Sequence, residues 1–197
     1  MIGHGRMVIL SRIGQIILFF SIETLQPNLH LMPLSMFQME NKYTMRIVID
    51  CDDAAFELKS VIVNHLKTKG VDVTDLNYMV YHPGAFYPEI GYNLALKIKD
   101  GQYDRGILIC GTGLGMAMIA NKVQGVYAGV CHDVFSAERL RKSNDAQILT
   151  MGARVIGPEL AKTIVDAWLI SEFQGGGSLA KVNQMRELES QSFNKLH

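Results

Sequence analysis

Apolar residues recur from residue 45 onward in two alternating patterns, short unbroken runs and longer segments of helical period. The short runs predict five strands, at residues 45–51, 71–76, 105–110, 125–131 and 146–152. The longer segments predict helices, at residues 54–69, 89–99, 114–123, 133–144 and 157–173, with a last polar helix at residues 179–192. Strands and helices that alternate in this way predict an α/β fold.

The third and fourth runs are apolar on both faces, which is typical of parallel strands covered by helices on both sides. We therefore predict a doubly wound, Rossmann-like sheet of five parallel strands, with helices on both faces and a C-terminal helix. In such sheets ligands bind beyond the carboxyl ends of the strands. Residues that follow the strands are thus the candidates for a functional site.

The first 44 residues are apolar but lack this regular alternation. Their longest unbroken apolar run, at residues 16–20, is far shorter than the roughly 20 residues of a membrane-spanning helix. Arg6 and Arg12 precede that run as in a secretory signal, yet no cleavage site of small residues follows. We expect residues 1–44 to be an N-terminal extension, disordered or read from an upstream start, and residues 45–197 to be the folded domain.

The charge and the cysteine content of the chain limit the kinds of ligand that it can bind. Lys and Arg total 19, as do Asp and Glu, so the chain has no net charge to attract nucleic acid or an anionic membrane. Three basic residues share one helix face, which we expect to be solvated: Arg139, Arg141 and Lys142. Three cysteines without paired spacing predict free thiols in a reducing, cytoplasmic setting, and no metal site. A small-molecule ligand fits best.

Cys110 ends the third predicted strand and is followed by glycines at 111, 113 and 115. Met116 breaks the dinucleotide-binding pattern, and no Lys-Ser or Lys-Thr pair completes a P-loop. A glycine turn that enters a helix still presents N–H groups to an anion and favours a thiolate. Cysteine is also among the most buried residue types. The residues alone therefore do not decide whether Cys110 is a buried core residue or a reactive thiolate. The sequence also leaves three roles for His132: a catalytic acid, a contact to phosphate, or a hydrogen-bonded structural histidine.

Four segments together resemble the family of ribose-5-phosphate isomerase B and the galactose-6-phosphate isomerase subunits: "DCDDAAFELK", "DRGILICGTGLGMAMIANKVQGVYAGVCHD", "SAERLRKSNDAQILTMGARVIGPELAKTIVDAWL" and "FQGGG". The resemblance covers residues 45–188 and implies an isomerase that interconverts aldose and ketose phosphates and needs no cofactor. It also implies a homodimer or homotetramer with active sites between subunits.

The resemblance gives Cys110 the role of the base that moves a proton between adjacent carbons. It implies that the N–H groups of Gly111, Gly113 and Gly115 receive the oxyanion and that Thr112 relays a proton.

The resemblance further implies substrate contacts from both sides of this loop. Asp52 would orient hydroxyls, Asn144 would contact the carbonyl end, and Tyr87 would lie beside the sugar. Each has a plain alternative: Asp52 and Asn144 as helix caps, Tyr87 as loop packing.

Three departures from the family pattern affect the substrate. Asp53 replaces a phosphate-binding histidine, and Gly177 replaces an arginine, which leaves Lys181 as the remaining cation. Ser143 replaces the histidine that opens the sugar ring. A tetrose 4-phosphate needs no such acid, because its ketose form cannot close a furanose ring. We therefore expect D-erythrulose 4-phosphate and D-erythrose 4-phosphate as the substrate pair. The alternatives are ribose 5-phosphate, as in ribose-5-phosphate isomerase B, and a non-catalytic subunit of the family.

Overall fold

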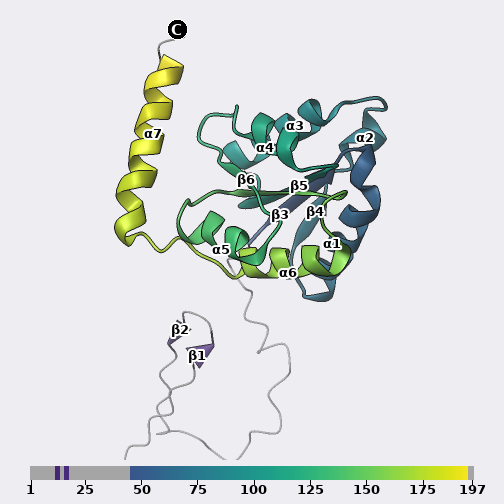
Figure 1. The fold of residues 1–197 in the computed structure, drawn as a ribbon, viewed down its shortest axis with the longest axis horizontal. Helices are drawn as coiled ribbons and strands as arrows, with labels where there is room; N and C mark the ends of the chain where they lie inside the picture. The colour runs from purple at the N-terminus through teal and green to yellow at the C-terminus, as the bar shows by residue number, and fades with distance from the viewer. Residues whose placement is uncertain (1–11, 14–15, 18–44, 195–197) are drawn as a thin grey trace, which may run out of the picture. The chain divides into compact units, whose positions relative to one another are not determined.

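The computed structural model describes residues 12–13, 16–17 and 45–194 (Figure 1). The chain divides into two compact units, Met1–Lys42 and Tyr43–His197. In the first unit, β1 (Arg12–Ile13) pairs antiparallel with β2 (Ile16–Ile17). The expectation that residues 1–44 form an extension therefore lies almost entirely outside the described residues and stays a prediction.

The second unit holds one five-stranded sheet in which every pairing is parallel. Its strand order is β4-β3-β5-β7-β6. The strands are β3 (Ile47–Cys51), β4 (Val73–Asp75), β5 (Arg105–Cys110), β6 (Ala128–Val130) and β7 (Ile148–Gly152). All residues of the central strands β3, β5 and β7 are buried, because helices cover both faces. The predicted fold class is confirmed.

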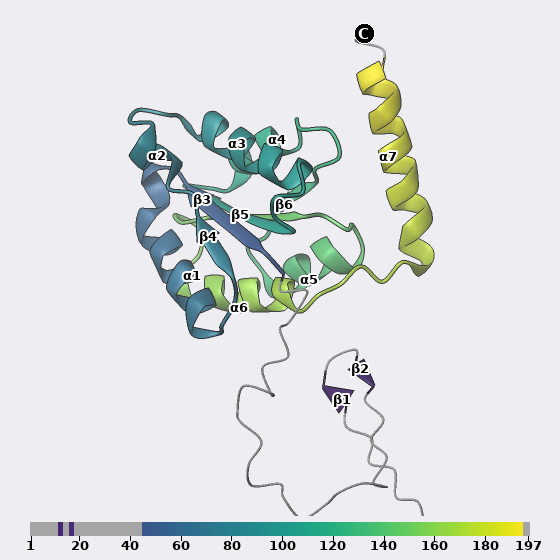
Figure 2. The ribbon, with the colours of Figure 1, turned by 180° about the vertical axis from the view of Figure 1, so that it is seen from behind.

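Two groups of helices sandwich the sheet, as Figures 1 and 2 show from opposite sides. One face packs against α1 (Phe56–Thr68), α5 (Val134–Lys142) and α6 (Pro158–Leu169), around a core that includes Trp168. The other face packs against α3 (Tyr87–Lys99) and α4 (Leu114–Ala120). Each helix thus buries its apolar stripe on the sheet, which is the main source of stability for such short helices.

The order of the strands places a topological switch point between β3 and β5. From β3 the chain passes through α1 to β4 on one side, then returns through α3, on the opposite face, to β5 on the other side. The register aligns Cys51 with Ile109, and Cys110 with Gly152 of β7. The residues after β3, β5 and β7 therefore meet at one end of the sheet, where ligands bind in doubly wound folds.

The loop between β4 and α3 contains a short helix, α2 (Tyr78–Tyr81), where we expect only turns. The buried carboxylate of Asp50 accepts the N–H of Tyr78 at 3.1 Å and so fixes the start of α2. A 3-10 turn, η3 (Asp53–Ala55), precedes α1. A second, η4 (Gly176–Ser178), precedes the C-terminal helix α7 (Leu179–Asn194). Helix α7 stands beyond the β6 edge of the sheet in both views (Figures 1 and 2).

The expected solvated face on α5 is wrong for Arg141. This side chain is buried and donates from Nη1 to the carbonyl oxygen of Ala146 at 2.7 Å. It also pairs with Asp145 at 3.2 Å, so its charge is compensated inside the protein. The helical pattern predicts an exposed Arg141, because its two partners, Asp145 and Ala146, lie after the end of α5 and do not belong to that pattern.

In the part of the chain that the structure describes, no helix has the length and apolar composition needed to cross a membrane.

Candidate active site

Cys110 lies at the junction of β5 and the glycine loop. Its side chain is only 6% exposed, and its Sγ accepts the backbone N–H of Gly113 at 3.0 Å. Gly113 has a φ of +79°, a conformation that glycine adopts without strain, and this turns its N–H toward the sulfur. The buried hydroxyl of Thr150 donates to the carbonyl oxygen of Gly113 at 3.0 Å and so holds the following peptide unit of the same residue. The sulfur therefore faces a fixed donor.

The other two cysteines are core residues. Cys51 and Cys131 are buried in the apolar cluster on the α1 and α6 face of the sheet. Burial raises the pKa of each thiol to about 12, because the low-polarity surroundings disfavour the thiolate. Both stay protonated near neutral pH. Among the described residues, no group of three histidine, cysteine or acidic side chains is placed to hold a metal ion.

The glycine loop leaves several donors available. The backbone N–H groups of Gly111, Thr112 and Gly115 have no hydrogen-bond partner among the residues that the structure describes. The N–H of Gly113 is already directed at Cys110, and that of Leu114 approaches the Thr112 hydroxyl at 3.4 Å. Of the glycine amides predicted to bind an oxyanion, Gly113 thus serves the sulfur instead. The N–H groups of Gly111 and Thr112, which directly follow Cys110, are the donors next to the sulfur.

Asp52 follows β3 and lies beside the end of β5, because its N–H donates to the carbonyl oxygen of Ile109 at 3.2 Å. Its carboxylate accepts the N–H of Ala54 at 3.1 Å and caps η3, as the alternative interpretation expects. Burial raises the pKa of the carboxyl group, and the positive charge of Arg154 opposes that shift. A cap uses one lone pair of one oxygen, so Asp52 keeps acceptor capacity for a ligand.

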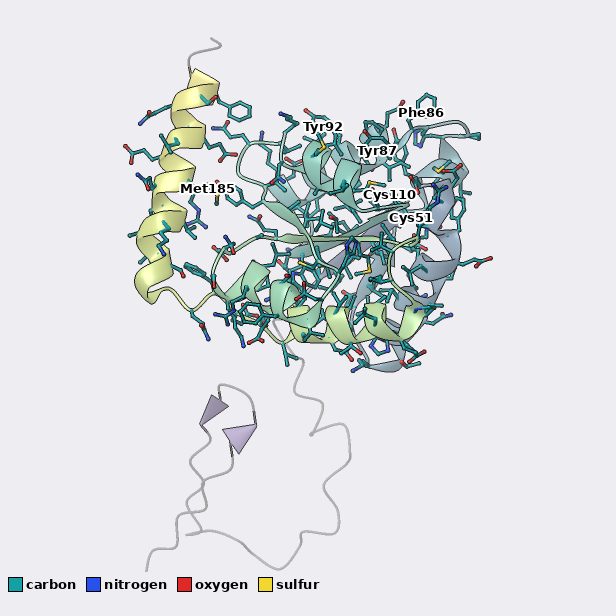
Figure 3. All side chains as sticks on the ribbon, viewed as in Figure 1. Cys51, Phe86, Tyr87, Tyr92, Cys110 and Met185 are labelled. Carbon is teal, nitrogen blue, oxygen red and sulfur yellow. The ribbon has the colours of Figure 1, made fainter. Side chains whose placement is uncertain are left out.

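Tyr87 begins α3 and packs on the first turn of α4. A Cβ on Gly115 would lie 2.5 Å from Cε2 of Tyr87, so the ring occupies the space that this glycine leaves open. The side chain remains 42% exposed. Figure 3 shows Tyr87 in the same region of the molecule as Cys110. Gly115 therefore serves a close contact with Tyr87, and the ring retains a free surface.

Arg154 is a site residue that the sequence analysis missed. It lies in the turn after β7, and its side chain covers Gly111, with Cδ 3.4 Å from where a Cβ on that glycine would be. Its backbone N–H donates to the carbonyl oxygen of Gly111 at 3.1 Å. The side chain is exposed and has no ion-pair partner among the described residues. A free guanidinium beside unpartnered N–H groups is suited to bind an anion.

The structure does not bring Lys181 and Asn144 into this cluster by any contact. Lys181 is exposed on α7, which is held to the β6 edge through Glu189 on Tyr127 at 2.7 Å and Arg186 on Asp145 at 2.7 Å. Asn144 is exposed directly after α5 and makes no hydrogen bond to a described residue. Neither residue caps a helix with its side chain.

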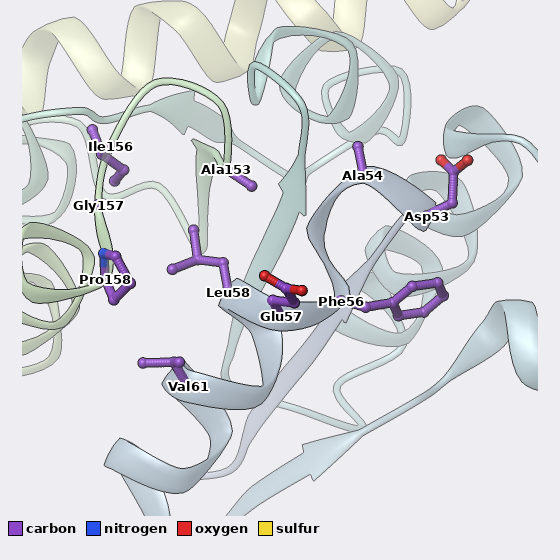
Figure 4. Close-up of a pocket in the computed structure, with 10 residues that line it drawn as sticks. All are labelled: Asp53, Ala54, Phe56, Glu57, Leu58, Val61, Ala153, Ile156, Gly157 and Pro158. Carbon is purple, nitrogen blue, oxygen red and sulfur yellow. The ribbon is translucent and has the colours of Figure 1, made fainter.

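A cavity of about 600 Å³ opens between the start of α1 and the segment from Ala153 to Pro158 (Figure 4). The described residues that line it include the carboxylates of Asp53 and Glu57 and no cation. Asp53 is the residue that departs from the phosphate-binding histidine of the family pattern. Two acidic groups make this cavity unsuited to a phosphate unless a cation from elsewhere enters it.

Comparison with known proteins shows the family to which the chain belongs. The family model described as Ribose/Galactose Isomerase matches residues 47–185. A D-erythrulose-4-phosphate isomerase of Pectobacterium atrosepticum is 52% identical over 147 residues, which cover 75% of this chain and 97% of the relative. A ribose-5-P isomerase B of Listeria innocua is 50% identical over 148 residues, covering 75% and 99%.

A solved structure of Clostridium thermocellum ribose-5-phosphate isomerase B superimposes with a TM-score of 0.70 at 42% identity. The superposition covers 75% of this chain and 99% of that one. The chain therefore belongs to the ribose/galactose isomerase family.

Proposed function

We propose that this protein interconverts the aldose and ketose forms of a sugar phosphate, with Cys110 as the base. The contact between Sγ of Cys110 and the N–H of Gly113 carries the proposal, because a fixed donor favours the thiolate that must remove a proton from carbon. Cys51 and Cys131 lack such a donor among the described residues and are held neutral by burial.

The reaction passes through an enediolate, and the loop provides donors for its charge. In the proposed order, the Cys110 thiolate takes a proton from the carbon next to the carbonyl, and the electron pair moves onto the carbonyl oxygen. The N–H groups of Gly111 and Thr112, which have no partner among the described residues, donate hydrogen bonds to that oxyanion. Cys110 then returns the proton to the neighbouring carbon, while the Thr112 hydroxyl relays the proton between the two oxygens.

The surrounding side chains fit the rest of a short substrate. Asp52 orients the hydroxyls, Tyr87 presents its exposed ring surface to the sugar, and Asn144 is assigned to the carbonyl end by family resemblance. Arg154 holds the phosphate, because it is the exposed cation that covers the loop.

An open-chain tetrose phosphate is the proposed substrate, with D-erythrulose 4-phosphate and D-erythrose 4-phosphate as the pair. Ser143, which replaces the ring-opening histidine, only receives a weak contact from Arg139 at 3.5 Å and has no suitable acidity. The relative from Pectobacterium atrosepticum, which is 52% identical and is named D-erythrulose-4-phosphate isomerase, supports the same substrate pair. Ribose 5-phosphate is the second candidate, favoured by the relative from Listeria innocua.

A second copy of the chain completes the site in this proposal. Lys181 belongs to α7, which stands beyond the β6 edge (Figure 1), and we assign it to the Cys110 loop of a partner subunit. The α3 and α4 side also exposes large apolar side chains that a subunit contact would cover: Phe86, Tyr92, Leu114 and Met118. We propose a homodimer or homotetramer, located in the cytoplasm, where the free thiols of the described domain persist.

The experiment is a coupled isomerase assay over tetrose, pentose and hexose phosphates, with light scattering to measure the oligomer. We expect kcat/KM for erythrulose 4-phosphate to exceed that for ribose 5-phosphate by at least about tenfold, as when one favourable contact is lost. Equal or faster turnover of ribose 5-phosphate rejects the tetrose preference. Failure to turn over any sugar phosphate rejects the isomerase and favours the non-catalytic subunit.

A further inference from the structure

His132 makes a contact at the end of the sheet that the proposed chemistry does not use. It follows β6, and its Nε2 accepts the backbone N–H of Gly152 at 3.0 Å. Gly152 ends β7 and is the register partner of Cys110 in β5. A backbone N–H only donates, so the Nε2 atom that faces it carries no proton and the imidazole is neutral. His132 thus contacts the end of β7, one of the three strands whose ends meet at the candidate site.

Gly152 is the point at which β7 touches the glycine loop. A Cβ on this residue would lie 2.7 Å from Cα of Thr112, so only a glycine lets the two backbones meet. The next peptide continues the contact, because the N–H of Ala153 donates to the carbonyl oxygen of Cys110 at 2.8 Å. Movement of the Gly152 peptide would therefore displace both the base and the loop.

The same segment holds the rest of the loop. Thr150 donates to Gly113, and Arg154 donates to Gly111, as described above. Residues 150–154 thus contact each loop residue from 110 to 113. Their central peptide, that of Gly152, is tied on its far side by His132.

We propose that His132 is a positioning residue, which holds the Gly152 peptide and through it the Cys110 loop in the reactive geometry. This inference rests on the proposed isomerase function. A role as the acid in place of Ser143 fits less well, because Nε2 is occupied by the Gly152 donor.

The contact requires only an acceptor atom that faces the Gly152 N–H. The neighbouring carboxylate, that of Asp133, is engaged by the N–H and hydroxyl of Ser136. A side chain at position 132 that keeps an acceptor should therefore hold the loop, and one that lacks it should not.

The test compares His132→Gln, which keeps an acceptor that does not titrate, with His132→Ala, which removes it. We expect His132→Ala to lower kcat by about tenfold or more with little change in KM, the loss expected for one hydrogen bond. His132→Gln should restore most of kcat, because its amide oxygen accepts the same N–H. His65→Gln is the matched control, because His65 contacts Asp166 of α6 at 2.8 Å, and its kcat should equal that of the wild type.

Hydrogen exchange gives a readout that does not depend on turnover. With glycine labelled by nitrogen-15, the Gly152 amide should exchange faster by about tenfold in His132→Ala than in the wild type, and His132→Gln should restore most of its protection. Unchanged exchange, or a His132→Ala enzyme with wild-type kcat, overturns the proposal. If the wild type has no isomerase activity, the proposed function fails, while the exchange experiment still decides whether His132 holds Gly152.

Discussion

Gly113 and Cys110 are joined by a hydrogen bond inside a four-residue turn, from the backbone N–H of the one to Sγ of the other at 3.0 Å. The sulfur is 6% exposed, so this donor replaces the water that would stabilise a thiolate at the surface. The base and the backbone of the loop are therefore coupled, and a change in either one alters both.

A pair of glycine substitutions separates this coupling from ordinary backbone strain. Gly113 and Gly125 have φ values of +79° and +82°, but a Cβ on Gly113 would lie 2.9 Å from the Met151 backbone, whereas one on Gly125 would meet nothing within 4 Å. We expect Gly125→Ala to cost about 1 to 2 kcal/mol of unfolding free energy and to keep kcat. Gly113→Ala should cost more and lower kcat by about a hundredfold. Equal losses from both, measured by urea unfolding and steady-state kinetics, would contradict the coupling.

Cys110→Ser tests the base directly. A hydroxyl is a far weaker base than a thiolate, so kcat should fall by about 10²- to 10⁴-fold, with a smaller change in KM. The matched control is Cys131→Ala, which removes a sulfur buried in the core and should lose about 1 kcal/mol of stability while keeping its kcat. A Cys110→Ser enzyme with full activity would favour a non-catalytic subunit.

Alkylation should distinguish the three thiols without mutation. The pKa of Cys51 and of Cys131 is raised to about 12 by burial, so at about pH 8 almost none of either is thiolate, the reactive form. Iodoacetamide should therefore label the peptide that carries Cys110 first, and a substrate phosphate should slow that labelling. Mass spectrometry after limited reaction reads out the order. Labelling of Cys131 ahead of Cys110 would sink this assignment of the reactive sulfur.

Acid should weaken the ion pair that ties the start of β3 to the turn before β5. A hydrogen bond from Arg46 lowers the pKa of Asp104, and the two side chains meet at 2.8 Å. A lowered carboxyl pKa adds stability above its ordinary range, and this stability is lost as pH falls through the folded-state value. Both groups are nearly half exposed, so the pair is worth at most about 1 kcal/mol. Asp104→Asn should lose that amount near neutral pH and nothing at about pH 2, with the exposed Asp100→Asn as control in urea unfolding.

The fold could be predicted from the sequence because each buried strand is a short apolar run, and each helix a longer periodic one. Helix α2 could not, since four residues are too few to show a period. It depends on the carboxylate of Asp50, which lies in β3 and accepts the N–H of Tyr78 across a gap of 28 residues. Such a long-range contact leaves no local pattern.

The candidate site was predictable only where it follows the strands directly. Asp52 and Cys110 end neighbouring strands, so their proximity follows from a parallel sheet. Arg154 could not be predicted, because it is a single arginine in the turn after β7 with no local motif. Its position over Gly111 depends on the order of β5 and β7 in the sheet. Lys181 lies on α7, beyond the β6 edge of the sheet. The order of residues along the chain does not show that α7 is separated from the Cys110 loop.

Arg154 gives the sharpest test of phosphate binding, because the nearby cavity offers carboxylates instead of cations. Arg154→Met should raise KM for the sugar phosphate by about ten- to a hundredfold, since one charge-assisted contact is worth that factor, and should lower kcat less. Arg154→Lys should recover part of the loss, because it restores charge but not the planar pair of donors. Arg46→Met is the matched control, an arginine before the start of β3 that pairs with Asp104 at 2.8 Å. Inorganic phosphate should inhibit the wild type competitively and Arg154→Met weakly; equal inhibition of both enzymes would place the phosphate elsewhere.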